Sequence, residues 1–556
     1  MKRSAFLWLS ICVLFCLSSA KAEKAFDFWV RLPEMAQSET TLGEVRVWTR
    51  GSTRYLFLPA VTQDKPLQVH TSLAGGVAID GELLQAGSIT QALIPGTTVN
   101  ITLGKRNYPI HIMQGSQLPA MWIATQKGSL EKIHASTKNV EPAQMLLLDA
   151  EGNQSYQGAL TELRGRGNAT FAFDKKPYQI KLAEKTSLLH MGKARTWVLL
   201  AEYNDYSMMR NKITFDLAAQ MGMDYVSQAQ WLDLYIDGDY KGVYLLAEKV
   251  HVDAERVDID DLEKVTEGLN EQPLDSYKMK GATKVTKGAS RGYQIPENPA
   301  DISGGYLLEI ELPYRYPGEP SGFVTNAGQP VVIKAPEYAS MEQLAYISNF
   351  IQGYENAISA EDGIDPQSGK HYSEFIDMDS LVKKYLLEEL AKNVDANKSS
   401  QYYYKPADSQ SPLAFAGPVW DYDSAYGNFA RSYNPRFASP DYLAAAVETG
   451  ELYYWWPKVY AHEDFRAHVT TVFHEQMVPA LRVLLGEEKA EGGSLCSLDE
   501  YEQQIFQSAE MNRIRWPHYR RQTHSVDTGK TLAENVDFLE RFIGQRMVFL
   551  LGTWPQ

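Results

Sequence analysis

The sequence predicts an α+β protein in which a small all-β domain is followed by a β-rich lobe and then by an α-rich lobe. Short runs of β-branched and aromatic residues, separated by Gly, Asn and Asp, recur through the first half of the chain and indicate strands. The second half carries apolar residues at the 3.6-residue period of helices. A chain of 556 residues is also too long for one core, because single cores stop growing at about 250–300 residues.

Residues 1–22 are expected to be a secretory signal peptide. Lys2 and Arg3 precede the apolar stretch "AFLWLSICVLFCLSSA", and "AKA" at 20–22 fits a small-x-small cleavage site. The alternative is a membrane anchor, but the apolar run is short for the ~20 residues that a span needs. We therefore expect an exported protein, in the periplasm, at the cell surface or secreted, with no membrane span after cleavage.

The charge of the chain argues against nucleic acid as a partner. The formal net charge is −15, and removal of Lys2, Arg3 and Lys21 with the signal makes it more negative. Affinity for nucleic acid comes mainly from Lys and Arg contacts to phosphate. Cys496 is the only cysteine outside residues 1–22, so no internal disulfide is expected.

Residues 23–115 predict the all-β domain. The stretches "EVRVWTRGSTRYLFLPAV", "LQVHTSLAGGVAIDG" and "TTVNITLGKRNYPIHIMQG" alternate strand-forming runs with turn residues, and no helical period interrupts them. This pattern is typical of a sandwich-like domain. An accessory binding or spacer role is the simplest interpretation.

The β-rich lobe is expected over residues 118–312. It contains strand-like stretches such as "PAMWIAT" and "GGYLLEIEL", and a hairpin, "QWLDLYIDGDYKGVYLLAEKV", that turns at Asp237-Gly238. The stretch "DYSMMRNKITFDLAAQMG" predicts one helix, with Gly222 at its C-terminal end. Residues 251–303 are polar and rich in Gly, Lys, Asp and Pro, and predict a mobile insertion.

The α-rich lobe is expected over residues 340–550. Helical periods occur in "MEQLAYISNFIQGYENAI", "DSLVKKYLLEELAKNV" and "LAENVDFLERFIGQRMVFLL". Within this lobe, "SQYYYKPA" and "PLAFAGPVWDYD" predict two short strands with a turn between them.

Two acids bracket these short strands. Asp395 follows a long helix, and Asp421 ends the second strand, with Ser400 between them. Phosphoryl transfer needs this layout, because one carboxylate orients the proton of the attacking hydroxyl and another holds Mg²⁺ against the phosphates. Taken alone, Asp421 and Asp423 before a glycine are more simply an acidic turn.

Basic residues in the β-rich lobe are candidate phosphate ligands. The loop containing Arg166, Gly167 and Asn168 is flexible and can direct N–H groups at an anion. Lys181 lies within the next strand. Arg210 opens the predicted helix, where a phosphate contact and a structural salt bridge are equally consistent with the sequence. Each of the other basic side chains, taken singly, is more simply a solvated surface cation.

Glu248 ends the strand "GVYLLAE", either in a cleft between the lobes or at its rim. The sequence contains no Gly-x-Ser-x-Gly elbow, no Walker-A loop and no zinc-type Cys/His spacing.

In order along the chain, these stretches resemble the spore coat protein H (CotH) kinase family of atypical, secreted-type protein kinases. The resemblance covers about residues 118–550 and rests on "LRGRGNAT", "KKPYQIKL", "NDYSMMRNKITFDLA", "LDLYIDGDYKGVYLLAEKV", "GGYLLEIE", "DSLVKKYLLEELAKNVDANKSSQYYYK" and "GPVWDYDSAYGN".

The resemblance implies a two-lobed protein-kinase-like fold, with ATP and Mg²⁺ or Mn²⁺ between the lobes. By position, Asp395 is similar to the catalytic-loop aspartate, and Asp421 to the metal-binding aspartate, with Asp423 as a second ligand. Ser400 takes the place of the metal-binding asparagine. The remaining similarities concern the nucleotide: the Arg166–Asn168 loop corresponds to the phosphate-covering turn, Lys181 to the strand lysine over the phosphates, and Glu248 to the hinge side of the cleft.

The first function hypothesis is an exported kinase that transfers the γ-phosphoryl of ATP to a hydroxyl, with Ser or Thr of an envelope or extracellular protein as acceptor. The alternative is a weak or inactive kinase-like surface protein, because Ser207–Met221 offers no glutamate to pair with Lys181 and serine binds metal less well than asparagine. A third hypothesis is a carbohydrate hydrolase, which needs two carboxyl groups about 5–9.5 Å apart.

Overall fold

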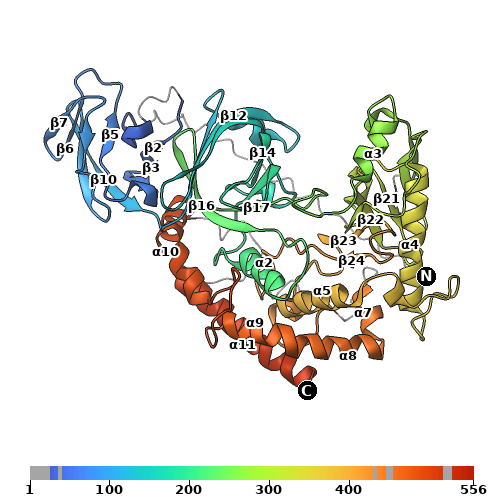
Figure 1. Ribbon diagram of the computed structural model, residues 1–556. Helices are drawn as coiled ribbons and strands as arrows, with labels where there is room; N and C mark the ends of the chain where they lie inside the picture. The colour runs from blue at the N-terminus through green and yellow to red at the C-terminus, as the bar shows by residue number, and fades with distance from the viewer. Residues whose placement is uncertain (1–25, 36–39, 283, 430–434, 446–454, 518–528) are drawn as a thin grey trace, which may run out of the picture.

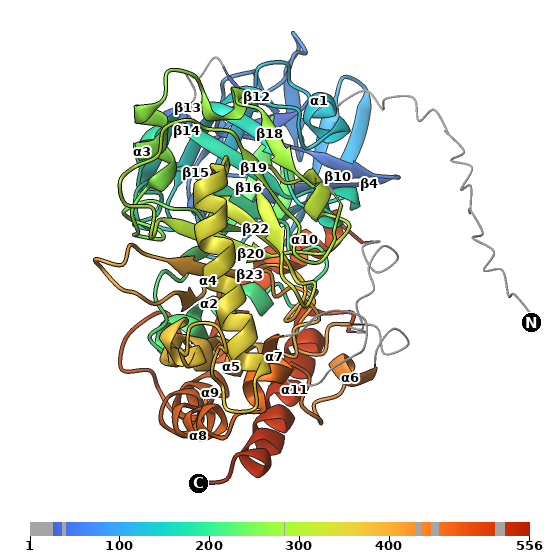
Figure 2. The ribbon, with the colours of Figure 1, turned by 90° about the vertical axis from the view of Figure 1, so that its right-hand side faces the viewer.

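The computed structural model describes residues 26–35, 40–282, 284–429, 435–445, 455–517 and 529–556, and is mixed α+β as predicted (Figures 1 and 2). The predicted signal peptide, residues 1–22, lies outside the described residues. Within the described ranges, every helix is too short or too polar to cross a lipid bilayer.

The N-terminal region is all-β apart from two short 3₁₀ turns, as the sequence predicts. This region has two sheets of its own, one with the order β2-β1-β5-β8 and the other with the order β3-β4-β10-β9-β6-β7. The strands are β1 (Trp29–Arg31), β2 (Glu44–Arg46), β3 (Trp48–Arg50), β4 (Thr53–Leu58), β5 (Leu67–His70), β6 (Val77–Ile79), β7 (Glu82–Leu84), β8 (Ile89–Thr90), β9 (Thr98–Leu103) and β10 (Arg106–Gln114). Inward-facing apolar residues of both sheets form one buried core.

This core extends into the next part of the chain. Trp122, Tyr235 and Tyr240, which lie beyond residue 115, belong to the same hydrophobic cluster. The Tyr235 hydroxyl donates to the Phe57 carbonyl at 3.0 Å, and the Trp122 indole N–H donates to the Glu44 carbonyl at 3.0 Å. The N-terminal region is therefore packed firmly against the following barrel.

Deletion of residues 26–115 is expected to destabilise the rest of the protein strongly. Trp122, Tyr235 and Tyr240 are each at most 1% exposed, and uncovering a large apolar side chain costs about 1.5–3 kcal/mol. Differential scanning fluorimetry of the chain with and without residues 26–115 measures the effect, with Tyr235→Phe as a mild control that removes only one hydrogen bond. Equal melting temperatures for the truncated and full chains would contradict the shared core.

A closed seven-stranded barrel follows, with the order β11-β12-β13-β14-β15-β17-β16. Its strands are β11 (Ala120–Thr125), β12 (Glu141–Leu148), β13 (Gln154–Gly165), β14 (Tyr178–Thr186), β15 (Ala194–Leu200), β16 (Ala229–Ile236) and β17 (Asp239–Glu248). The predicted hairpin is confirmed, because β16 and β17 pair around Asp237 and Gly238, whose φ angles of 53° and 83° suit a tight turn between twisted strands.

Two helices accompany the barrel, the short α1 (Glu131–Ala135) and α2 (Arg210–Gln220). The predicted end of α2 is also confirmed. Gly222 has a φ of 66°, and the Met223 N–H donates to the Ala218 carbonyl at 3.0 Å, which closes the helix as a left-handed glycine cap does.

A seven-stranded sheet, here called the second sheet, accompanies the barrel and differs from the expected division into lobes. Residues 251–303, predicted as a mobile insertion, contain α3 (Leu262–Leu269), β18 (Met279–Gly281) and β19 (Ser290–Tyr293), and the two strands belong to this sheet. The sheet has the order β18-β19-β21-β22-β20-β23-β24, so it combines strands from both sides of the lobe boundary expected near residue 312. The remaining strands are β20 (Tyr306–Ile310), β21 (Gly322–Val324), β22 (Pro330–Ala335), β23 (Gln401–Lys405) and β24 (Phe415–Ala416). Strands of three residues are too short to reveal an alternating pattern.

Helices cover this sheet and form the lower part of the molecule (Figure 1). They are α4 (Met341–Ser359), α5 (Met378–Ala391), α6 (Pro435–Ala438), α7 (Trp455–Tyr460), α8 (Glu463–Val472), α9 (Val478–Leu484), α10 (Leu498–Arg515) and α11 (Leu532–Thr553). Helix α4 runs along the second sheet (Figure 2), and α5 contacts α2, α8 and α11. The α5 helix therefore lies at the centre of the helical core and fixes the segments at its C-terminal end.

Candidate functional site

A polar pocket of about 620 Å³ lies where the barrel, the second sheet and the segment after β24 meet. The lining includes Arg164, Arg166, Gly167, Asn168, Lys249, Glu309, Asp395, Ser400, Tyr402, Trp420, Asp421 and Asp423. The pocket thus brings together the predicted catalytic residue, the three predicted metal ligands and the predicted phosphate loop.

Asp395 lies in the turn after α5. This helix ends at Lys392, which adopts a left-handed φ of 47°, and the Asn393 side chain accepts a hydrogen bond from the Asp395 N–H at 3.0 Å. The Asp395 carboxylate is 3.6 Å from the Lys398 ammonium. Burial raises the pKa of Asp395 to about 6, Lys398 opposes the rise, and the charge of Asp421 adds to it.

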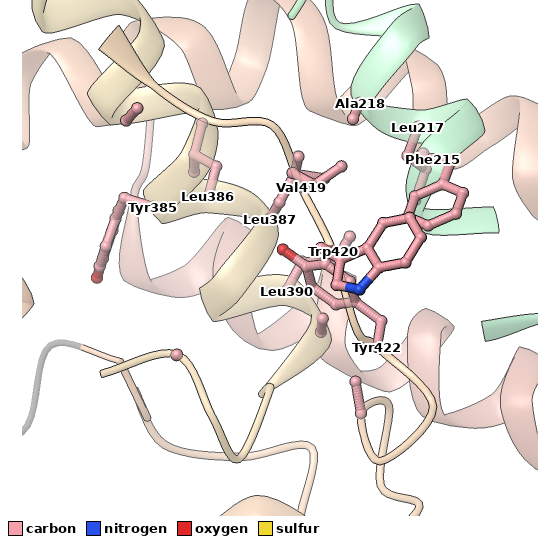
Figure 3. Packing of buried hydrophobic residues seen from close by; sticks show 14 of the residues in the cluster. Phe215, Leu217, Ala218, Tyr385, Leu386, Leu387, Leu390, Val419, Trp420 and Tyr422 are labelled. Carbon is pink, nitrogen blue, oxygen red and sulfur yellow. The ribbon is translucent and has the colours of Figure 1, made fainter. Parts of the chain in front are cut away.

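The segment after β24 alternates between core and pocket. Val419, Trp420 and Tyr422 belong to the hydrophobic core formed with α2 and α5 (Figure 3). Trp420 stacks on Phe215 with ring centroids 5.6 Å apart, and the Tyr422 hydroxyl donates to Glu388 at 2.5 Å. Because these aromatic residues are anchored in the core, Asp421 and Asp423 are left to line the pocket.

The backbone at two of these positions is strained. Ser400 and Asp421 have φ angles of 56° and 70°, which side-chain-bearing residues adopt rarely. The Ser400 hydroxyl donates to the Asp421 carboxylate at 3.2 Å, so the two unusual conformations place interacting side chains together. Such strain costs about 1–3 kcal/mol per residue and is found mainly at functional sites.

Asp421 and Asp423 form a site that a hard cation fits. Burial, followed by the charge of Asp421, raises the pKa of Asp423 above the usual aspartate value. In the described part of the chain, no Lys or Arg ion-pairs with either carboxylate, and no group of three or more acidic, His or Cys side chains could hold a metal by itself. Mg²⁺ needs only one or two protein carboxylates when phosphate oxygens and water complete its shell, so the residues fit this ion.

Opposite kinds of charge line the pocket, because basic side chains are present in addition to Asp395, Asp421 and Asp423. Arg164 lies one residue before the end of β13, Arg166 directly follows that strand, and Lys249 comes directly after β17. The Arg166 guanidinium lies over the Trp420 ring at 5.8 Å. Sequence reasoning missed Lys249, although its place at the end of a buried strand beside Glu248 was a usable signal.

Lys181 lies outside this pocket, and its predicted place over the phosphates is corrected here. Its ammonium is 3.0 Å from Glu162 on the neighbouring strand β13, with 40% of the side chain exposed. Its neighbours Ile180 and Leu182 point into the barrel interior and are fully buried. The alternation of the strand therefore directs Lys181 to the outer surface, where a partner already neutralises it.

Glu248 and Arg210 also lie outside the pocket. Glu248 is 2.6 Å from Arg256 and accepts a hydrogen bond from the Gln228 N–H at 3.0 Å. Arg210 is fully buried, ion-pairs with Asp205 and donates to the Ala425 carbonyl at 2.9 Å. Of the two roles that the sequence allowed for Arg210, the geometry supports the structural salt bridge.

Helix α2 holds the acidic segment in place through a contact that the sequence did not suggest. The Asn211 side-chain carbonyl accepts a hydrogen bond at 2.7 Å from the N–H of Tyr422, which lies between the two aspartates. The Asn211 amide group donates to Glu202 at 3.1 Å. Together with Arg210, Asn211 fixes the backbone that carries Asp421 and Asp423.

Comparison with known proteins agrees with this geometry. The family model described as CotH kinase protein matches residues 163–550. No curated protein matches the chain. The family match leaves out the N-terminal all-β region, spans every pocket residue named above, and covers well over half of the chain, so the protein belongs to the CotH kinase family.

Proposed function

We propose that the protein is an exported, metal-dependent atypical kinase that transfers the γ-phosphoryl of ATP to a hydroxyl, with Ser or Thr of an envelope or extracellular protein as the acceptor. In this view the barrel forms most of one kinase-like lobe and the helical part forms the other. The observation that carries the proposal is the pocket itself, in which Asp395 lies with two carboxylates that make no close ion pair within the described residues and with a set of cations, in a CotH kinase family member.

Asp395 is the proposed catalytic residue. It would orient the acceptor hydroxyl and take its proton while the acceptor oxygen bonds to the γ-phosphorus and the bond from that phosphorus to the bridging oxygen of ADP breaks. About a third of the Asp395 side chain, 30%, is exposed, which leaves room for an acceptor to reach it.

Asp421 and Asp423 are the proposed metal ligands, and Ser400 supports Asp421 through its hydrogen bond. A bound Mg²⁺ or Mn²⁺ ion would offset the charge of the phosphates as the bond to the leaving oxygen breaks. The two carboxylates need such a cation, because in the described ranges no basic side chain pairs with them.

Addition of ATP with Mg²⁺ or Mn²⁺ is expected to stabilise the mature chain. A ligand at about 100 times its Kd raises the free energy of unfolding by about 2.7 kcal/mol. Thermal unfolding followed by fluorescence should show a higher melting temperature with metal and ATP together than with either alone, and EDTA should remove the difference. Asp421→Asn is the matched control, since it keeps the shape of the side chain. A melting temperature that does not change when ATP and metal are added would instead favour a kinase-like binding protein that no longer binds nucleotide.

A further inference from the structure

The cations of the pocket come from two places in the barrel: Arg164 and Arg166 lie at the end of β13, and Lys249 follows β17. Arg164 is paired in register with Gln179, Gln179 with Val198, and Val198 with Ala247. Residues paired across neighbouring strands point to the same face, and residues two apart on one strand do so as well. Lys249, two residues after Ala247, therefore extends the face that carries Arg164, and both line the pocket.

Within the described part of the chain, these cations lack the close ion pairs that their neighbours make, and Asp421 and Glu309, the carboxylates whose charges act on Arg166, lie beyond ion-pair distance. Lys334 is 3.1 Å from Glu319, and Arg315 is 3.4 Å from Glu311, in the same pocket. In the described ranges, by contrast, no carboxylate ion-pairs with Arg164, Arg166 or Lys249, and the buried Arg164 Nε has no hydrogen-bond partner. The three cations are half-buried, and their like charges act on one another, so their grouping indicates a site for an anion.

We propose that Arg164, Arg166 and Lys249, here called the cationic wall, bind the phosphate chain of a nucleoside triphosphate, with Lys249 supplying the lysine contact that the sequence assigned to Lys181. The inference rests on the proposed function and deepens it. Guanidinium groups bind two phosphate oxygens in a fixed planar geometry, and a lysine adds a compact charge. The Trp420 ring beneath Arg166 limits the orientations of that guanidinium.

The protonation of Lys249 should also change when an anion binds to the cationic wall. Burial, together with the charges of Arg164, Lys334 and Arg166, lowers the pKa of Lys249 to about 8, and the charge of Glu337 opposes this shift. A bound phosphate chain would favour the ammonium form and raise the pKa of Lys249. Binding near pH 8 should therefore be coupled to proton uptake by this side chain.

Isothermal titration calorimetry of the full mature chain tests the wall, with tripolyphosphate, ATP and adenosine as probes and no added metal. Lys249→Gln should bind tripolyphosphate and ATP tenfold to hundredfold more weakly than wild type, because it loses a hydrogen bond to a charged group. Adenosine binding should not change. Lys181→Gln is the matched control, because Lys181 is also a lysine on the outer barrel face but is paired with Glu162. It should alter affinity less than twofold.

The same calorimetric titrations, carried out at pH 8 in buffers with different ionisation enthalpies, measure the proton uptake that accompanies binding. Wild type should take up protons on binding tripolyphosphate, and Lys249→Arg should bind it with a smaller uptake, since arginine stays charged whereas Glu309 and Asp423, whose pKa values burial raises, titrate in both proteins. Lys249→Arg also keeps the test valid if Lys249→Gln fails to fold. Tripolyphosphate binding by Lys249→Gln at wild-type strength, or equal losses in Lys249→Gln and Lys181→Gln, would overturn the inference.

The two proposals fail in different ways. If tripolyphosphate binds through Lys249 but no phosphoryl transfer occurs, the wall stands and the kinase activity does not. If transfer occurs and Lys249→Gln keeps the wild-type KM for ATP, the kinase assignment stands and the wall is wrong.

Discussion

Asp395→Ala is expected to remove phosphoryl transfer while leaving the fold intact. Loss of a general base typically lowers a rate 10²–10⁴-fold. The Asp395 side chain is 30% exposed, and within the described residues its one ion pair is the 3.6 Å contact with Lys398, so little packing is lost. Initial rates with γ-labelled ATP and a thermal melt of the same sample measure the two effects together.

The control for this change is Asp537→Ala, which removes an exposed acid on α11 far along the chain from the pocket segments. It should retain the wild-type rate. Retention of more than about a tenth of the activity by Asp395→Ala would remove this residue from the role of general base, given the usual size of the effect.

Arg210→Met is expected to destabilise the protein by about 3–5 kcal/mol, because it leaves a buried carboxylate without its cation. Arg210 and Asp205 are both fully buried, and Asp205 also accepts N–H hydrogen bonds from Ser207 at 2.9 Å and Met209 at 3.0 Å. Loss of the guanidinium also frees the Ala425 carbonyl, at 2.9 Å from Arg210 Nε, in the segment that carries both proposed metal ligands. Activity should therefore fall together with stability.

Urea unfolding followed by tryptophan fluorescence measures the change in stability. The double variant Arg210→Met, Asp205→Asn removes the buried charge and should recover part of the loss, since residues in one ion pair are coupled. A midpoint for Arg210→Met close to that of wild type, or no recovery in the double variant, would argue that the pair does not support the segment.

Local patterns in the sequence predicted the parts of the structure that depend on local geometry. Asp237-Gly238 fixed a hairpin, because both positions favour positive φ. The sequence also predicted Asp395 and Asp421 on either side of two short strands, and both residues line the pocket. The acidic half of the site could therefore be read from residue order.

The basic half could not be read in this way. Lys181 and Lys249 are both lysines at the barrel strands, and only the strand register and the position of Glu162 separate a neutralised surface lysine from one that faces the pocket. Register between distant strands is set by tertiary packing and leaves no local pattern. The same reason applies to the shared core of Trp122 and Tyr235 with the N-terminal region, which joins residues far apart in the sequence.

The most direct measurement of the central claim is labelling by γ-³²P-ATP with Mg²⁺ or Mn²⁺, comparing the mature wild type with Asp421→Ala. Asp421 is exposed in the pocket and holds no core contact of its own, so its loss should affect chemistry more than folding. The account predicts label transfer by the wild type only, and none after EDTA is added. Equal labelling by both proteins, or none by a wild type that also fails to bind ATP, would contradict it.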